Sequence, residues 1–234
     1  MLGTQLTLGG ACARYGVGSL ANTFLPGRVG DAVRVGLFGR VSPGGTLSVV
    51  GAVAGVGAVR WLALLPLGIA GILGSGLPPL ALTGAALALV PLPAAWLLAR
   101  RGSTRARAAL APLRGASRAT YAAVLAWVAG TLTARIAAAA AGGVALGISH
   151  PLATALLVVP ALEVAGLVPL TPANVGVAGG AAAVAFHAHG TPMHSAVAAG
   201  FMLHAVETGA GIAFGLASTF ALARMNRVAG LTHP

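Results

Sequence analysis

The charged residues of the stretch NTFLPGRVGDAVRVG, residues 22–36, stand out in a chain that has few of them. Arg28, Asp31 and Arg34 lie less than two helical turns apart, on an arc of about 120° of a helix, so that Asp31 can reach both arginines. Guanidinium groups that converge in this way can hold a phosphate by bidentate, charge-assisted hydrogen bonds. The spacing predicts an anion-binding fork, in which Asp31 keeps the two guanidinium groups splayed while no anion is bound.

A break in the backbone accompanies these residues. Pro26 lacks a backbone donor, and Gly27 and Gly30 loosen the chain, so we expect a helix to begin near Gly30 after an interruption. A second interrupted segment, PLTPANVGVAGG at 169–180, lies in the other half of the chain. Broken helices at membrane depth are tolerated where they are buried in protein or line a watery cavity, and a pair of them points to a transporter-like site.

Composition places these residues in a membrane protein. Of the 234 residues, 57% are hydrophobic and 7% are charged, and the mean hydropathy is +0.92. Soluble domains carry about 25% charged residues, which they need to cover their surface against water. We therefore predict an all-α polytopic integral membrane helix bundle of about six or seven spans, with one or two broken or re-entrant helices. Residues 1–234 form a single transmembrane domain in this interpretation.

The same composition argues against several other classes. The formal net charge is +11, but the arginines lie in short loops and apolar spans, whereas a nucleic-acid interface needs them on a solvated face. A single cysteine, Cys12, excludes an internal disulfide and a cysteine-based metal site. His204 and Glu207 share a helix face but lack further partners at metal-ligand spacing. Because no nucleophile–base spacing is present either, we expect no metal, no cofactor and no enzyme activity.

Hydropathy and arginine placement predict the spans and their orientation. The loop at 100–118 holds six of the fourteen basic residues and no acid, so it should be cytoplasmic, as should the tail at 223–234. For the tail to be inside, something between 171 and 192 must cross, and the short stretch 174–187 is available either as a thin, broken span or as a re-entrant element; parity favours crossing. A shorter apolar stretch precedes the opening motif at 6–20. The predicted spanning helices are 47–73, 79–99, 119–146, 152–170 and 193–222.

Four ionisable residues fall near the middle of predicted spans. Each costs about 2.5–3.5 kcal/mol near the bilayer centre on insertion scales, so such residues usually face the bundle interior and pair. Two cations and two anions can pair without residual charge. We expect Arg60 and Glu207 to be electrostatically matched, with Arg135 and Glu163 as the alternative partners.

The ordered motifs of the chain resemble one known family. NTFLPGRVGDAVRVGLFGR, GAVAGVGAVRWLAL, PLTPANVGVAGGAAAVAFHAHGTP and AVAAGFMLHAVETGAGIAFGL are similar, in that order, to motifs of the lysylphosphatidylglycerol-synthase transmembrane family. This flippase-like family includes the membrane half of the multiple-peptide-resistance factor, and the resemblance covers residues 20–222. The resemblance places the following residues in its motifs: Asn22, Pro26, Gly27, Arg28, Gly30, Asp31, Arg34, Arg60, Pro172, Asn174, Gly176 and Glu207, with His204 where the family pattern has Gln.

The resemblance implies a function that residue spacing alone does not give. Members are multi-pass proteins of the cell membrane that move or bind anionic phospholipids or polyprenyl-linked lipids. It implies a lipid translocase with an arginine-lined cavity, in which Arg28, Asp31, Arg34 and Arg60 hold the anionic headgroup. The alternative is a non-transporting subunit that docks a membrane glycosyltransferase or another lipid-modifying enzyme. The chain holds no aminoacyltransferase domain, so lysyl transfer is not implied.

The lone cysteine makes the predicted orientation testable. In a protein with Cys12→Ala, we expect a cysteine at Ser103 to be shielded from impermeant thiol reagents in intact cells, because the loop at 100–118 is cytoplasmic. A cysteine at Ser149 should label under the same conditions. Labelling at position 103 from outside would overturn the orientation.

Overall fold

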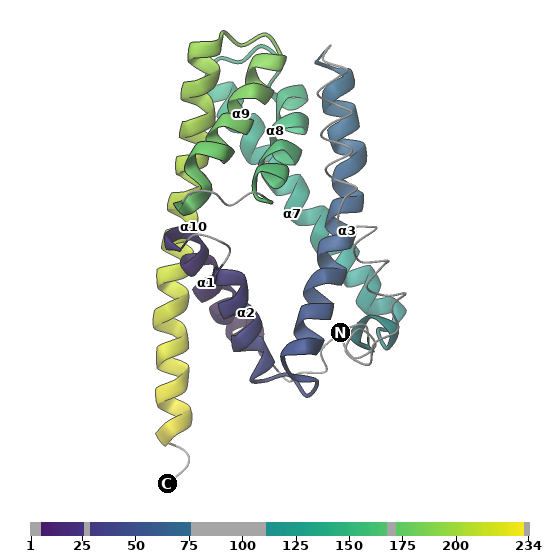
Figure 1. Ribbon diagram of the computed structural model, residues 1–234, viewed down its shortest axis with the longest axis vertical. Helices are drawn as coiled ribbons and strands as arrows, with labels where there is room; N and C mark the ends of the chain where they lie inside the picture. The colour runs from purple at the N-terminus through teal and green to yellow at the C-terminus, as the bar shows by residue number, and fades with distance from the viewer. Residues whose placement is uncertain (1–5, 26–28, 76–110, 168–171, 232–234) are drawn as a thin grey trace.

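The computed structural model describes residues 6–25, 29–75, 111–167 and 172–231 (Figure 1). Within these ranges the chain is helical and contains no strand, which confirms the predicted all-α class. The predicted span at 79–99, most of the loop at 100–118, and the residues Pro26, Gly27 and Arg28 lie outside the described residues. The elements are α1 (Leu8–Phe24), α2 (Val29–Gly39), α3 (Gly45–Leu73), α7 (Arg118–Ala145), α8 (Pro151–Ala165), η1 (Pro172–Asn174), α9 (Val175–Ala188) and α10 (Met193–Leu231).

Three of the described helices are long and apolar enough to cross a membrane. They are α3 with 29 residues, α7 with 28 and α10 with 39. At about 1.5 Å per residue each exceeds the roughly 30 Å of a hydrocarbon core. Helix α10 continues to Leu231, so the predicted tail after residue 222 is largely helical.

The other four α-helices are shorter and form two hairpins. Helices α1 and α2 have 17 and 11 residues and pack against each other, as do α8 and α9, which have 15 and 14 residues. At about 1.5 Å per residue, these helices measure roughly 16–26 Å, less than a hydrocarbon core. The α1–α2 pair rises from the lower end in Figure 1 and turns back at mid-height, whereas the α8–α9 pair descends from the upper end. The short helix η1, in the turn of the α8–α9 hairpin, packs against α1.

This arrangement corrects one sequence prediction and favours one of two alternatives for another. The segment at 152–170 was expected to span, and 174–187 was expected to be either a thin, broken span, which parity favoured, or a re-entrant element. Instead α8 ends at Ala165 and α9 returns toward the end from which α8 came (Figure 1). Because a hairpin that turns back replaces two successive crossings, the two ends of the segment stay on the same side, and the predicted parity of the chain is unchanged.

The turn of the α8–α9 hairpin is made by backbone that L-residues rarely adopt. Ala173 and Asn174 have φ values of 52° and 54°, and the side-chain Nδ2 of Asn174 donates to the carbonyl of Ala165 at 2.8 Å. Non-glycine residues in this region cost free energy and persist where the surroundings hold them. The amide of Asn174 is one such restraint, since it ties the start of α9 to the end of α8.

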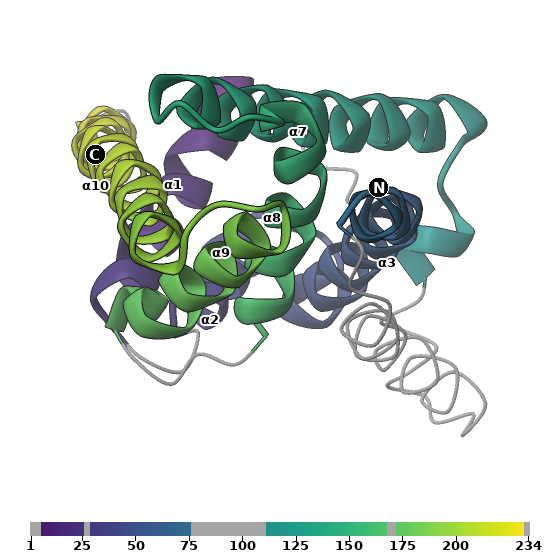
Figure 2. The same cartoon turned by 90° about the horizontal axis from the view of Figure 1, so that it is seen from above.

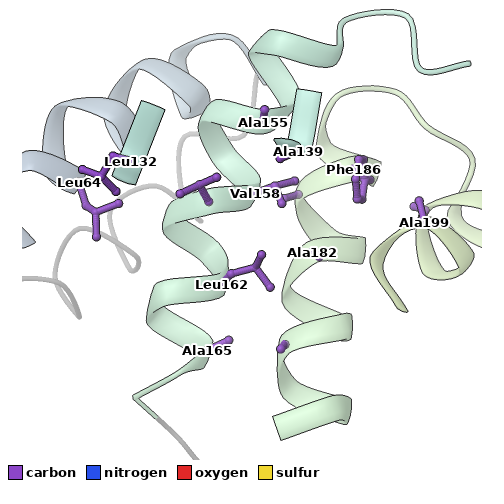
Figure 3. Packing of buried hydrophobic residues seen from close by; sticks show 14 of the residues in the cluster. Leu64, Leu132, Ala139, Ala155, Val158, Leu162, Ala165, Ala182, Phe186 and Ala199 are labelled. Atoms are coloured by element: carbon purple, nitrogen blue, oxygen red, sulfur yellow. The ribbon is translucent and has the colours of Figure 1, made fainter. Parts of the chain in front are cut away.

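Helix α8 lies at the centre of the packed region. Seen from above in Figure 2, α7, α3 and α9 surround it, and all three contact it. Six of its 15 residues are buried, and Val158 meets Ala182 and Phe186 of α9 in the core (Figure 3). Apart from Thr154 and Glu163 the helix is apolar, which suits a position enclosed by other helices.

Helix α10 contacts both hairpins, through α9 and through α1. Its first half packs on α9, where a Cβ on Gly200 would collide with backbone of Gly179 and Ala183. Its second half packs on α1, where a Cβ on Gly215 would collide with Leu20. Small residues let helix backbones approach closely in a bilayer, where burial from water contributes little to association.

Candidate functional site

A polar cluster lies between α1 and α2, beside the first break. The Asp31 carboxylate Oδ1 accepts from Arg34 Nη1 at 3.1 Å and from Asn22 Nδ2 at 3.0 Å. Arg34 Nη2 donates to Ser19 Oγ at 3.2 Å, and its guanidinium carbon lies 3.9 Å from the centroid of the Tyr15 ring. The three α1 residues recur at intervals of four and three, which places them on the face of α1 that meets α2.

Two glycines allow the hairpin to close around this cluster. A Cβ on Gly30 would overlap the carbonyl oxygen of Gly18 and the amide of Asn22, and a Cβ on Gly18 would meet Cβ of Arg34 at 2.9 Å. The Arg34 side chain therefore lies across the bare backbone of Gly18. Gly30, which the resemblance placed in the first motif, has a packing role as well as a place next to the break.

Arg34 keeps one unused donor inside the protein. Its side chain is 16% exposed, and its Nε is buried without a hydrogen-bond partner among the described residues. A guanidinium group carries five N–H donors, so the contacts to Asp31 and Ser19 do not exhaust it. An unpaired buried donor costs free energy unless a ligand or water satisfies it.

Four side chains of alternating charge, called the charge chain below, link the long helices to α8. Glu163 on α8 accepts from Arg60 of α3 at 2.5 Å and from Arg135 of α7, through the same oxygen. Arg135 also donates from Nη2 to Glu207 of α10 at 3.1 Å. From contact to contact, the four side chains follow the order Arg60, Glu163, Arg135 and Glu207. The two cations and two anions balance, as the sequence predicted.

The pairing within this chain differs from the one we expected. Arg60 contacts Glu163, and Glu207 contacts Arg135, so each of the two residues pairs with one of the alternative partners. The reason is positional, since α8 lies against both α3 and α7 and brings Glu163 between their arginines. Arg60 uses only Nη2 here, and its Nε is buried without a partner in the described part of the chain.

The turn before α9 is held from α10 by a histidine. His204 Nε2 lies 2.8 Å from the carbonyl oxygen of Ala173, one of the two residues with positive φ. With Nε2 protonated, His204 donates to that carbonyl. Thr208 Oγ1 is a more distant neighbour of the same ring nitrogen, at 3.4 Å.

The structure thus divides the predicted site residues between groups. Asn22, Asp31 and Arg34 come together between α1 and α2, whereas Arg60 and Glu207 belong to the charge chain. Among the described contacts, Arg34 and Arg60 share no partner. The remaining motif residues, Pro172, Asn174, Gly176 and His204, lie in η1, at the start of α9 and on α10.

Several contributing residues were absent from the predicted site. Tyr15 and Ser19 contact Arg34, and their signal in the sequence is the helical spacing from Asn22. Arg135 and Glu163 were recognised as expensive charges in spans, but nothing in the sequence showed that they connect Arg60 to Glu207. Within the described ranges, no group of three or more His, Cys, Asp or Glu side chains is placed to hold a metal ion.

Comparison with known proteins identifies the family. The model of the lysylphosphatidylglycerol synthase TM region matches residues 1–215. The chain belongs to this family. The matched model describes a transmembrane region, in agreement with the three long apolar helices. No curated protein and no solved structure matches the chain.

The observed pairing can be tested by double-mutant cycles. Arg60→Gln and Glu163→Gln remove the two sides of a direct contact, so their effects on stability should couple by about 0.5–3 kcal/mol. The cycle of Arg60→Gln with Glu207→Gln should give a smaller coupling, because the two side chains communicate through Glu163 and Arg135. Thermal unfolding of the purified variants in detergent measures both terms. Additive effects in the first cycle, together with strong coupling in the second, would contradict this order of contacts.

Proposed function

We propose that this protein binds the anionic headgroup of a membrane lipid between its two broken hairpins, as a lipid-translocase-like protein of the plasma membrane. Phosphate is the chemical group recognised, carried by a phospholipid or by a polyprenyl-linked lipid. The observation that carries the proposal is the pair of arginines, Arg34 and Arg60, each with a buried Nε that has no partner among the described residues.

The unused donors support an anion as the missing partner. Arg34 is tied to Asp31 and Ser19, and Arg60 is tied to Glu163, so both guanidinium groups are held in place before any ligand arrives. Preorganised guanidinium groups match the geometry of phosphate and form charge-assisted hydrogen bonds with it. Water also satisfies such donors, but a guanidinium donor forms a shorter and stronger, charge-assisted hydrogen bond with an anion.

The ends of the broken helices add positive potential at the same level. Helix α2 begins at Val29 and α9 begins at Val175, each directly after the turn of its hairpin. Helix N-termini present unsatisfied N–H groups and a positive dipole end, which attract anionic groups in the discontinuous helices of transporters. Asn174, the N-cap of α9, makes no side-chain capping bond, and the first turn of α9 holds no acid.

A lipid suits this site better than a soluble anion does. The helices around it expose large apolar side chains, including Leu62, Phe214 and Phe220, as expected for surfaces that face acyl chains. A lipid can keep its tails in the bilayer while its headgroup enters between the hairpins. Membership of the family, whose model is the transmembrane region of a lipid-related protein, supports the same class of ligand.

Lysine substitution at Arg34 distinguishes two roles for this residue. Arg34 either binds phosphate or only sets the membrane orientation through its positive charge. Arg34→Lys keeps the charge but loses the fork that holds Asp31 and Ser19, so the affinity for phosphatidylglycerol should fall. Contacts of this kind contribute about 1.5–3 kcal/mol, so Arg34→Gln should weaken binding by roughly ten- to a hundredfold, and Arg34→Lys by less. Titrations of the purified variants followed by native mass spectrometry give these affinities.

Phosphatidylcholine and a second arginine provide the controls. Binding of this zwitterionic lipid should respond little to either Arg34 variant. Arg224→Lys, at an exposed position near the end of α10, should leave binding of both lipids at the wild-type level. If Arg34→Lys and Arg60→Lys both match wild type for both lipids, the headgroup site is wrong.

A further inference from the structure

Glu207 is the end of the charge chain and, among the described residues, is held by one shared cation. It accepts a hydrogen bond from Arg135 at 3.1 Å, and Arg135 also serves Glu163. Glu163 has two cationic partners, Arg60 and Arg135, and its side chain is 20% exposed against 37% for Glu207. Glu207 is therefore the more accessible of the two carboxylates and has fewer cationic contacts among the described residues.

We propose that Glu207 is a proton-binding site whose occupancy is coupled to binding of the anionic headgroup. This inference rests on the proposed function, because it concerns the same ligand. It adds a second ligand, the proton, and a way in which a proton gradient can act on lipid affinity.

Charge balance provides the coupling. With Glu207 ionised, the four side chains of the charge chain carry two positive and two negative charges, and an entering phosphate adds an unbalanced negative charge to the interior. With Glu207 protonated, the same four side chains carry one net positive charge, and Arg135 Nη2 is released from its ion pair. A net charge in a low-dielectric interior is costly, so the proton and the anion each favour the other. Such coupling is reciprocal: lipid binding must raise proton uptake by the same free energy by which a proton raises lipid affinity.

The surroundings of Glu207 leave Arg135 as its ionic contact in the described part of the chain. On α10 itself, His204 lies one turn away, with its Nε2 against the Ala173 carbonyl. Tyr15, on α1, stacks under the guanidinium of Arg34. The charged or titratable side chains on the helices that pack against α10 are Arg118, Tyr121 and Arg135 on α7, His187 on α9, and Cys12, Arg14 and Tyr15 on α1.

Proton uptake on lipid binding tests the proposal. Phosphatidylglycerol is added to the full-length protein in weakly buffered neutral detergent containing a pH-indicator dye, and its affinity is measured over a range of pH. The phosphodiester keeps its single charge through the neutral range, so any proton taken up goes to the protein. We expect uptake that approaches one proton per bound lipid, and an affinity that falls as pH rises by up to about tenfold per pH unit within the titration window.

Variants assign the proton to its residue. Glu207→Gln should bind phosphatidylglycerol without proton uptake, at a pH-independent affinity close to that of wild type at low pH. Glu207→Asp keeps a carboxyl group and should retain uptake, which guards against a loss caused by misfolding of the glutamine variant. His204→Gln should retain uptake as well, and His194→Gln, at an exposed position at the start of α10, should behave as wild type.

The outcomes separate this inference from the function on which it rests. If wild type binds phosphatidylglycerol in preference to phosphatidylcholine but takes up no proton, the coupling is wrong and the headgroup site stands. If uptake persists in Glu207→Gln and disappears in His204→Gln, the proton belongs to the histidine and the proposal is overturned. If phosphatidylglycerol does not bind in preference to phosphatidylcholine, both the headgroup site and its coupling to a proton are wrong.

Discussion

A bilayer offers no partner to a charge or to an unpaired backbone group, so the protein must supply one, and the described structure follows from this constraint. Each charged residue near the bilayer centre costs about 2.5–3.5 kcal/mol on insertion scales. Arg60, Glu163, Arg135 and Glu207 answer that cost by forming one neutral chain across α3, α8, α7 and α10. The charge chain therefore adds ion pairs to the apolar packing that holds these helices together.

The same constraint explains where the broken helices are allowed. A helix that stops halfway exposes carbonyl and N–H groups, which is tolerated only against protein or a polar interior. The turn before α9 meets this condition through Asn174, which bonds the end of α8, and through His204, which bonds the Ala173 carbonyl. In the first hairpin, the Asn22–Asp31–Arg34 cluster places hydrogen-bonded polar side chains beside the break. Polar side chains thus gather beside both turns, where the backbone of a broken helix needs partners.

Part of this arrangement could be predicted from the sequence. Low charge and long apolar runs predict the membrane class, and the motifs predict the family that the comparison confirms. The break before Gly30 and the reach of Asp31 to Arg34 follow from local rules, namely the properties of Pro and Gly and the three-residue spacing on a helix. These features depend on neighbours in the sequence, which is why they transfer to the structure.

Other features depend on how distant segments pack, and the sequence does not carry that information locally. Hydropathy alone cannot distinguish one 19-residue span at 152–170 from a 15-residue helix followed by a turn, because the segment is predominantly apolar over its whole length. Charge complementarity predicted that two arginines and two glutamates would pair, but the partners are set by the position of Glu163 between α3 and α7. Tyr15 joins the site for a similar reason, since Gly18 lets α2 lie close enough to α1 for Arg34 to reach it.

The depth of the α8–α9 turn in the bilayer tests the central claim most directly, namely that the chain turns back inside the membrane. Gly176 follows this turn, is exposed, and has open space where a side chain would project. In a protein with Cys12→Ala and Gly176→Cys, a spin label at this cysteine can be placed by its collision rates with oxygen and with a water-soluble relaxation agent. The account predicts a depth near the bilayer centre. A label at the interface opposite Ser149 would mean that α8 spans the membrane, and would contradict the account.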